Sequence, residues 1–463
     1  MTSVMTRPRV FAPRYRAVST GFVALSLLVA FEYLAVATAM PRIGRELHGY
    51  HLYALAFSGN LAANIIATLV GGRWSDARGP GAALWAGVGG FIAGLAVSGL
   101  APGMEVFLAG RFLQGFGGGL FNVALYVLVA RVYPAPLHPR VFSLLAAAWV
   151  LPSIVGPALT GIVAERWSWR WVFLGVAVVA VPAALVMRRG LRTGGEKPAA
   201  GPAGELPAGE VSGATAPGFP RRLAWGVLAA LGAALLQYGS GTPESGIPLA
   251  AAGLAALALS LPRLLPSGAL RAARGLPAVV ALRGLAAGSF FAAEVFVPLT
   301  LTAERGLSTA QAGLALTGGA VAWSFGSWIQ GRLPGARVRT LRLGTALIAL
   351  GVSITALTVF RQVPVAVAFG GWMTAGLGIG MVFPTLSVLV LELSAPGEQG
   401  RASASMSIGE SALSIVAVAL TGALYAVFRG TPATYLVCFG LLVVMAATGT
   451  ALADRVRPEP ERD

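Results

Sequence analysis

Lysine, cysteine and histidine are nearly absent from the sequence, and each shortage argues against a kind of chemistry. The only lysine, Lys197, lies in a polar stretch, so no Gly-Lys pair forms a Walker A phosphate loop and the chain is not itself an ATP-driven pump. The only cysteine, Cys438, excludes an internal disulfide and cysteine-based metal sites. The three histidines lie in predicted loops. We therefore expect no cofactor, no metal and no enzyme activity.

Charge is also scarce: 11% of the 463 residues are charged, against about 25% in soluble domains. Hydrophobic residues make up 56% of the chain, before its 61 glycines are added. This composition excludes a soluble globular protein and indicates a polytopic helical protein in a lipid bilayer. The formal net charge is +16, but the basic residues are spread over short loops between apolar runs, so a nucleic-acid partner is not expected.

Apolar runs long enough to cross a bilayer, about 20 residues each, recur along the chain. We predict fourteen helices, starting near Ala17, His51, Gly81, Val106, Val141, Trp171, Leu223, Ile247, Pro277, Thr309, Leu341, Pro364, Ala402 and Thr434. They divide the chain into an N-terminal six-helix half (1–188), a flexible cytoplasmic linker rich in Gly, Pro, Ala and Glu (189–222), two additional helices (223–275) and a C-terminal six-helix half (276–463). The additional pair over 223–262 either spans the membrane or lies at its surface as a hairpin.

The distribution of basic residues predicts the topology. With the N-terminus inside, 25 of the 34 basic residues fall on the inner side, seven fall outside, and Arg111 and Arg283 fall within helices. This bias favours cytoplasmic N- and C-termini in a cell membrane and an even number of helices, which twelve and fourteen both satisfy. The basic start followed by an apolar run resembles a signal peptide, but the run is too long and contains Glu32, so cleavage is not expected.

An internal repeat relates the first six helices to the last six. Gly115, Gly117 and Gly119 correspond to Gly376, Gly378 and Gly380, an offset of 261 that also relates 158–161 to 419–422. Two similar six-helix halves are the organisation of secondary transporters, whose substrate site lies between the halves near the membrane midplane. The glycines themselves are best interpreted as close-packing positions between helices.

The most specific motif lies on the fourth predicted helix, which contains Arg111, Gln114 and Gly115 in the pattern R-x-x-Q-G-x-G. With this motif the chain resembles the major facilitator superfamily, and most closely its fourteen-helix drug:proton antiporter branch, over nearly its whole length. The resemblance implies that Arg111 takes part in proton coupling. The alternative is that Arg111 only donates hydrogen bonds to backbone carbonyls. Trp372 stands at the matching position of the second half, so the repeat itself does not require the charge.

The loop after the second predicted helix is similar to the family pattern G-x-x-x-D-[RK]-x-G-[RK]-[RK]. Gly72, Asp76 and Gly79 match and Arg78 lies between them, whereas Ala77, Pro80 and Gly81 replace the basic positions. The resemblance implies that Asp76 stabilises the outward-facing state by capping a helix N-terminus of the other half, near residues 400–403. The alternative is a solvated acidic residue in a loop.

The fifth predicted helix contains Gly156, Pro157 and Gly161, which resemble the antiporter motif G-P-x-x-G-G with Thr160 in place of one glycine. The resemblance implies a bend in this helix that seals the interface between the halves.

Three acidic residues fall within apolar helices: Glu32, Glu294 and Glu410. A buried carboxyl group without a partner takes up a proton readily near neutral pH, which is what a proton-coupled carrier requires. The first helix resembles that of the fourteen-helix branch in having an acid nine residues before a proline, here Glu32 and Pro41. Nearby aromatic residues form either a surface for an apolar or cationic ligand or ordinary packing; they are Phe31, Tyr33, Phe290, Phe291 and Phe296. Trp167, Trp169 and Trp171 are interpreted as an interfacial belt.

Together these features predict a monomeric, proton-coupled exporter of small amphipathic compounds or drugs that works by alternating access. Protons, a small-molecule substrate and the lipid bilayer are the expected partners. Two alternatives remain open: a carrier for metabolite uptake or facilitated diffusion, and a lipid-handling or partner-binding membrane protein whose additional helix pair docks the partner.

Overall fold

The computed structural model describes residues 10–134, 137–193, 219–240, 246–332, 337–394, 399–428 and 433–457, and these residues are all helix, turn or coil. The α-helices are α1 (Arg16–Glu46), α2 (Leu55–Arg78), α3 (Pro80–Gly99), α4 (Met104–Val132), α5 (His138–Arg166), α6 (Arg170–Thr193), α7 (Phe219–Ser240), α8 (Ile247–Leu264), α9 (Leu276–Ala303), α10 (Thr309–Gln330), α11 (Arg337–Leu357), α12 (Ala366–Glu392), α13 (Gln399–Phe428) and α14 (Thr434–Leu452). Each begins within about four residues of its predicted start, so the fourteen-helix prediction is confirmed.

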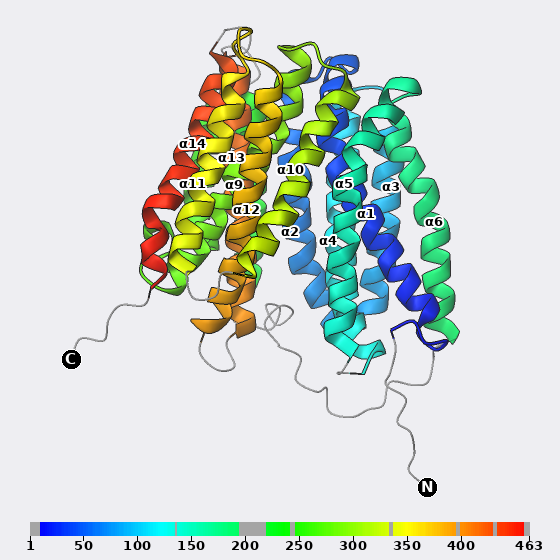
Figure 1. Ribbon diagram of the computed structural model, residues 1–463. Coiled ribbons are helices and arrows are strands. Elements are labelled where there is room, and N and C mark those ends of the chain that lie inside the picture. The colour runs from blue at the N-terminus through cyan, green and yellow to red at the C-terminus, as the bar shows by residue number, and fades with distance from the viewer. Residues whose placement is uncertain are drawn as a thin grey trace, which may run out of the picture.

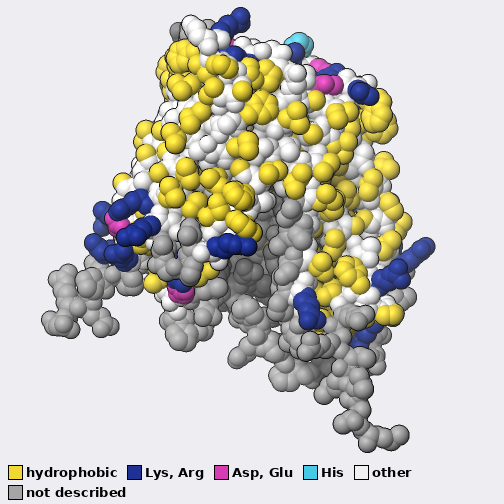
Figure 2. Space-filling view, in the orientation of Figure 1, with side chains coloured by type: hydrophobic (Ala, Val, Ile, Leu, Met, Phe, Trp, Pro, Cys, Tyr) yellow, Lys and Arg dark blue, Asp and Glu magenta, His cyan; other side chains and the backbone are white. Residues whose placement is uncertain are grey.

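Twelve of these helices are long and apolar enough to cross a membrane. Of the other two, α10 carries several Thr, Ser and Gln side chains, and several side chains of α5 lie outside the described residues. Helices satisfy all their backbone hydrogen bonds internally, which is why apolar chains adopt them inside a bilayer. Hydrophobic side chains are spread over the middle of the visible face, and charged side chains gather toward its two ends (Figure 2).

Helices α1–α6, here called the N-terminal bundle, and α9–α14, the C-terminal bundle, pack in the same pattern. In the first, α1 packs on α5 and α6, and α4 packs on α2 and α3; in the second, α9 packs on α13 and α14, and α12 packs on α10 and α11. The bundles lie side by side, with α10 next to α5 (Figure 1). The first turn of α1 and the last turn of α14 lie at the same end, called the terminal end; the opposite end is called the far end.

The repeated glycines act as close-packing positions in both bundles. On α4, a Cβ atom added to Gly115 would collide with the backbone of Asn60 in α2. On α12, a Cβ atom on Gly376 would collide with the backbone of Gly319 in α10, the equivalent pair of helices. The interpretation of these glycines as packing residues is confirmed, and the same contact recurs at the repeat offset.

The additional helices α7 and α8 form an antiparallel pair that lies along α2 and α13. Gln237 of α7 donates a hydrogen bond to Ser58 of α2 (Nε2 to Oγ, 2.8 Å), and a Cβ atom on Gly226 would contact Leu69 further along α2. Alanine and leucine side chains of α7 and α8 pack against α2 and α13 in one apolar cluster. Because α7 packs along α2 over several turns, the α7–α8 pair is part of the helical assembly and is not a detached surface hairpin. Residues 194–218, most of the predicted linker, lie outside the described residues.

The tryptophan belt is only partly as predicted. Trp167 and Trp171 are exposed, but Trp169 is fully buried and packs edge-to-face on Phe107 and Phe173. The belt interpretation is therefore wrong for Trp169, which is a core residue of the N-terminal bundle because its indole turns inward from the start of α6.

Candidate functional site

Glu32 of α1 and Arg111 of α4 form an ion pair inside the N-terminal bundle, with side chains 5% and 3% exposed. Arg111 also donates to Gln114 Oε1 (2.7 Å) and to the carbonyl of Ala56 (3.3 Å). Arg111 therefore contacts a carboxylate as well as a backbone carbonyl, and its part in proton coupling stays a prediction. A charge in an apolar interior is costly unless it is paired in this way, so the pair holds α1, α2 and α4 in one arrangement.

Aromatic side chains take the place of this ion pair in the C-terminal bundle. Trp372, at the repeat position of Arg111, is buried and stacks on Phe290 of α9, with ring centroids 4.7 Å apart. Trp323 of α10 and Phe383 of α12 extend the cluster, and both contact Phe291. The result is an aromatic surface built on α9, α10 and α12, which we call the aromatic cluster: Phe290, Phe291, Trp323, Trp372 and Phe383.

Glu294 lies on α9 one helical turn beyond the aromatic cluster and is half-buried. Within the part of the chain that the structure describes, no ion pair or side-chain hydrogen bond involves its carboxyl group. Tyr33 of α1 packs edge-to-face on Phe291, with ring centroids 6.4 Å apart, and so joins the two bundles here. Tyr33 directly follows Glu32 on α1, so this contact joins the helix of the buried ion pair to the aromatic cluster.

Glu410 of α13 has a partner that the sequence reasoning missed. Arg283 of α9 contacts its carboxylate (Nε to Oε2, 2.6 Å) and donates to the carbonyl of Phe383 (3.0 Å). The guanidinium group also lies 3.5 Å from the Phe383 ring centroid, a cation–π contact. Side-chain exposures of 13% and 24% make this pair more accessible than the Glu32–Arg111 pair. The sequence did contain a signal for this partner, because Arg283 and Arg111 are the two arginines within predicted apolar helices and such a charge needs a partner.

The motif residues of α5 lie at the contact between the two bundles. A Cβ atom on Gly161 would lie 2.6 Å from the backbone nitrogen of Ala310 in α10. A Cβ atom on Gly313, one turn along α10, would lie 2.6 Å from the carbonyl oxygen of Pro157. Gly156 faces the ring of Phe31 on α1. Helices α5 and α10 therefore meet backbone to backbone.

The loop motif is described only in part. Gly72 is buried within α2, Arg78 is exposed in its last turn, and Gly79 has the left-handed φ of 79° that links α2 to α3. A positive φ explains the glycine at this position, because other residues are strained there. The structure does not describe the side chains of Asp76, Arg401 and Ser403, so the capping role of Asp76 near residues 400–403 stays a prediction.

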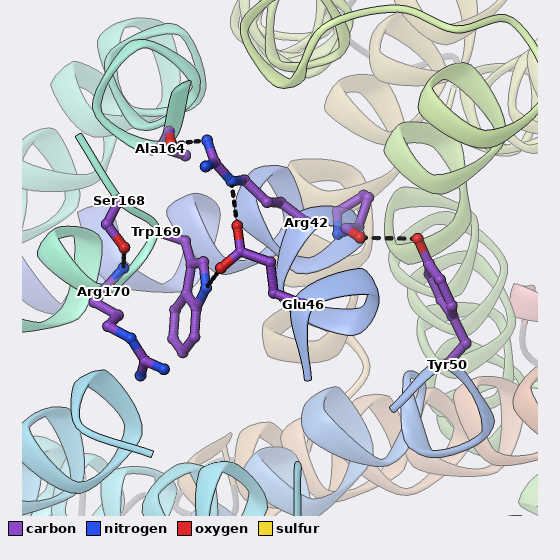
Figure 3. A network of polar contacts seen from close by, with 8 residues as sticks. Arg42, Glu46, Tyr50, Ala164, Ser168, Trp169 and Arg170 are labelled. Atoms are coloured by element: carbon purple, nitrogen blue, oxygen red, sulfur yellow. Dashed lines mark hydrogen bonds and ion pairs between the residues drawn. The ribbon is translucent and has the colours of Figure 1, made fainter. Parts of the chain in front are cut away.

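Polar contacts tie together the far ends of α1, α5 and α6 (Figure 3). Glu46 accepts hydrogen bonds from Arg42 (2.7 Å) and from the indole nitrogen of Trp169 (2.7 Å). Arg42 also donates to the carbonyl of Ala164 in the last turns of α5. Two further contacts cross between the bundles at this end: Tyr53 donates to the carbonyl of Val295 (3.0 Å), and Glu165 accepts from the backbone of Ala310 (2.6 Å).

Comparisons with known proteins agree with this geometry. The family model for the Major Facilitator Superfamily matches residues 22–293 and 279–463. A probable multidrug-efflux transporter of Mycobacterium tuberculosis is 27% identical over 421 residues, covering 83% of this chain and 82% of that protein. Multidrug resistance protein 3 of Bacillus subtilis is 28% identical over 176 residues, 37% of this chain and 34% of that protein. Among solved structures, a POT family transporter in complex with 5-aminolevulinic acid has a TM-score of 0.69 at 12% identity, covering 96% of this chain and 97% of the other, and so shares the fold.

Two similarly packed bundles of apolar, membrane-length helices are the architecture of a multi-pass membrane transporter. The chain belongs to the Major Facilitator Superfamily. The predicted family is therefore confirmed, and the multidrug-efflux relatives agree with the resemblance to the drug:proton antiporter branch.

Proposed function

We propose that this chain is a proton-coupled exporter of small amphipathic compounds in the cell membrane. The observation that carries the proposal is which of the three intramembrane acidic residues has an arginine partner. Glu32 and Glu410 each have an arginine partner, whereas Glu294 has none among the described residues and lies beside the aromatic cluster. The multidrug-efflux names of the relatives support the same substrate class.

The chemistry of Glu294 suggests how protons and substrate would compete. A carboxyl group beside apolar and aromatic side chains is neutral when it carries a proton and is an anion when it does not. The anion favours a cationic or polar head group, and the aromatic cluster offers flat surfaces for an apolar body. Proton and substrate then exclude each other at one carboxyl group, as antiport requires.

The remaining features divide the other roles. The Glu32–Arg111–Gln114 contacts link the first and fourth helices of one bundle, so Arg111 would transmit a change in charge at the cavity to the packing of that bundle. The α5–α10 contact at Pro157 and Gly161 would open and close as the six-helix halves, 1–188 and 276–463, rock about the site. In this proposal the chain works as a monomer with both termini in the cytoplasm.

Inverted membrane vesicles with an imposed proton gradient test the proposal. Lipophilic cations and neutral drugs are added to vesicles that contain the wild type, Glu294→Gln, Glu32→Gln or the control Glu105→Gln, an exposed acid at the far end of α4. We expect a compound to dissipate the gradient with the wild type and with Glu105→Gln, but not with Glu294→Gln. Equal transport after the gradient has been collapsed would contradict proton coupling, and counterflow without proton movement would favour a facilitated-diffusion carrier.

A further inference from the structure

Glu165 bridges the two bundles at the far end. It lies in the last turn of α5, and its Oε1 accepts a hydrogen bond from the backbone N–H of Ala310, the second residue of α10 (2.6 Å). The first N–H groups of a helix have no acceptor within the helix, and an anion there also interacts favourably with the helix dipole. The contact is therefore a charge-assisted hydrogen bond between bundles.

The N-terminus of α10 has its own cap, and this cap leaves the backbone N–H of Ala310 available to Glu165. Ser308 Oγ accepts from the backbone of Gln311 (3.3 Å), and the Gln311 side chain accepts from the backbone of Ser308 (3.0 Å). This capping box satisfies the N–H groups of Ser308 and Gln311 but not that of Ala310. Because the capping box already stabilises the start of α10, the main effect of the Glu165–Ala310 hydrogen bond is to join the two bundles.

Two features keep the carboxylate at this position. Gly161 lies one turn before Glu165 and lets α5 approach Ala310 closely, while Gly313 leaves room for the carbonyl of Pro157. The end of α5 is also held by the hydrogen bond from Arg42 to the carbonyl of Ala164, next to Glu165, within the network of Figure 3. The bond to Ala310 is thus made when the far ends of α5 and α10 are together, and it breaks when they separate.

The repeat-equivalent contact, between α13 and the start of α2, has no acidic residue at the position of Glu165. At the repeat offset of 261, Gly422 corresponds to Gly161, and it likewise packs against an alanine at the start of a helix of the other bundle, Ala54 before α2. The position equivalent to Glu165 is Ala426. The repeat reproduces the close packing of both contacts, but among the described side chains only the α5–α10 contact includes an acidic group.

We infer that Glu165 is a latch that stabilises the conformation in which the far end of the transporter is closed. On the cytoplasmic-termini topology this is the closed outer side. The chemistry is the same as that expected of Asp76 at the terminal end: a carboxylate of the N-terminal bundle on a helix N-terminus of the C-terminal bundle. The two acids would therefore favour opposite states of the transport cycle. This inference rests on the alternating access of the proposed function but not on its proton coupling or its substrate.

Double electron–electron resonance on the purified full chain in detergent tests the latch, without substrate or proton gradient. In a Cys438→Ser background, spin labels at Leu100→Cys and Ala303→Cys report the far-end distance between the bundles, since both positions are exposed. Glu165→Ala and Glu165→Gln are compared with the matched control Glu105→Gln. We expect Glu165→Ala to raise the ratio of far-end-open to far-end-closed molecules by roughly two- to fivefold. Glu165→Gln should have a smaller effect because its amide oxygen still accepts the hydrogen bond.

Unchanged distance distributions in both Glu165 variants would overturn the inference, and so would an equal shift in Glu105→Gln. If Glu165→Ala does not fold, Glu165→Gln alone decides, because it keeps the size of the side chain. The measurement is independent of transport. A shifted distance distribution in a protein that moves no protons would support the latch and contradict only the proposed coupling.

Discussion

Trp372 stacks on Phe290, with 19° between the ring planes, at the place where the other bundle pairs Arg111 with Glu32. The same two helices of each repeat are in contact, but one contact is ionic and the other aromatic. The N-terminal bundle thus has a buried ion pair, and the C-terminal bundle has the aromatic cluster. Glu294, without a partner among the described residues, adjoins that surface. The two repeats share their packing and differ in their chemistry.

Breaking the Glu32–Arg111 pair should destabilise the protein more than removing both charges. Arg111→Gln leaves the Glu32 carboxylate buried without its counterion, at a cost of about 3–5 kcal/mol in the free energy of unfolding. The double variant Glu32→Gln with Arg111→Gln should recover a large part of that loss. Thermal unfolding in detergent measures the difference, and strictly additive losses would show that the pair is not coupled.

The aromatic cluster should determine affinity for compounds with a flat apolar body. Phe291→Ala removes a ring that contacts Tyr33, Trp323 and Phe383, so we expect binding of an aromatic cation to weaken by about three- to tenfold. Phe325→Ala is the control, because Phe325 is an exposed aromatic residue of α10 outside the cluster. Tryptophan fluorescence titration gives both dissociation constants. Equal losses in the two variants would place the ligand elsewhere.

The close packing of α12 on α10 should not tolerate a single added methyl group. Gly376→Ala places a Cβ atom against the backbone of Gly319 and should cost roughly 1–3 kcal/mol in stability. Gly370→Ala is a matched control on the same helix, since a Cβ atom there meets nothing within 4 Å. The unfolding temperature in detergent should fall for Gly376→Ala alone. A similar fall in both variants would point to a general intolerance of α12.

The sequence was sufficient for the features that depend on local pattern. Apolar runs located the helices to within a few residues, and the glycine repeat at 115 and 376 located equivalent close contacts, because backbone approach requires the missing side chain in both bundles. The resemblance carried by Arg111, Gln114 and Gly115 gave the family, which the matching family model confirms.

Partners across helices could not be predicted in the same way. Whether Glu410 meets Arg283 depends on the rotation of α13 against α9, and Glu165 meets Ala310 only because α5 and α10 touch at Gly161. Trp169 was misplaced because it lies in the short connection between α5 and α6, where no helical period indicates which way the side chain points, two residues from the exposed Trp167 and Trp171. Single-sequence periodicity does not fix these rotations when a helix is apolar on every side.

The central claim is that a proton and the substrate exclude each other at Glu294. The most direct test is to measure the protons released when a substrate binds. A lipophilic cation is added to the purified protein in lightly buffered detergent with a pH indicator, while binding is followed separately. We predict that the wild type releases about one proton for each cation bound, and that Glu294→Gln releases none while still binding measurably. Glu32→Gln should still release a proton, because Glu32 is already neutralised by Arg111. Undiminished proton release from Glu294→Gln would contradict the account.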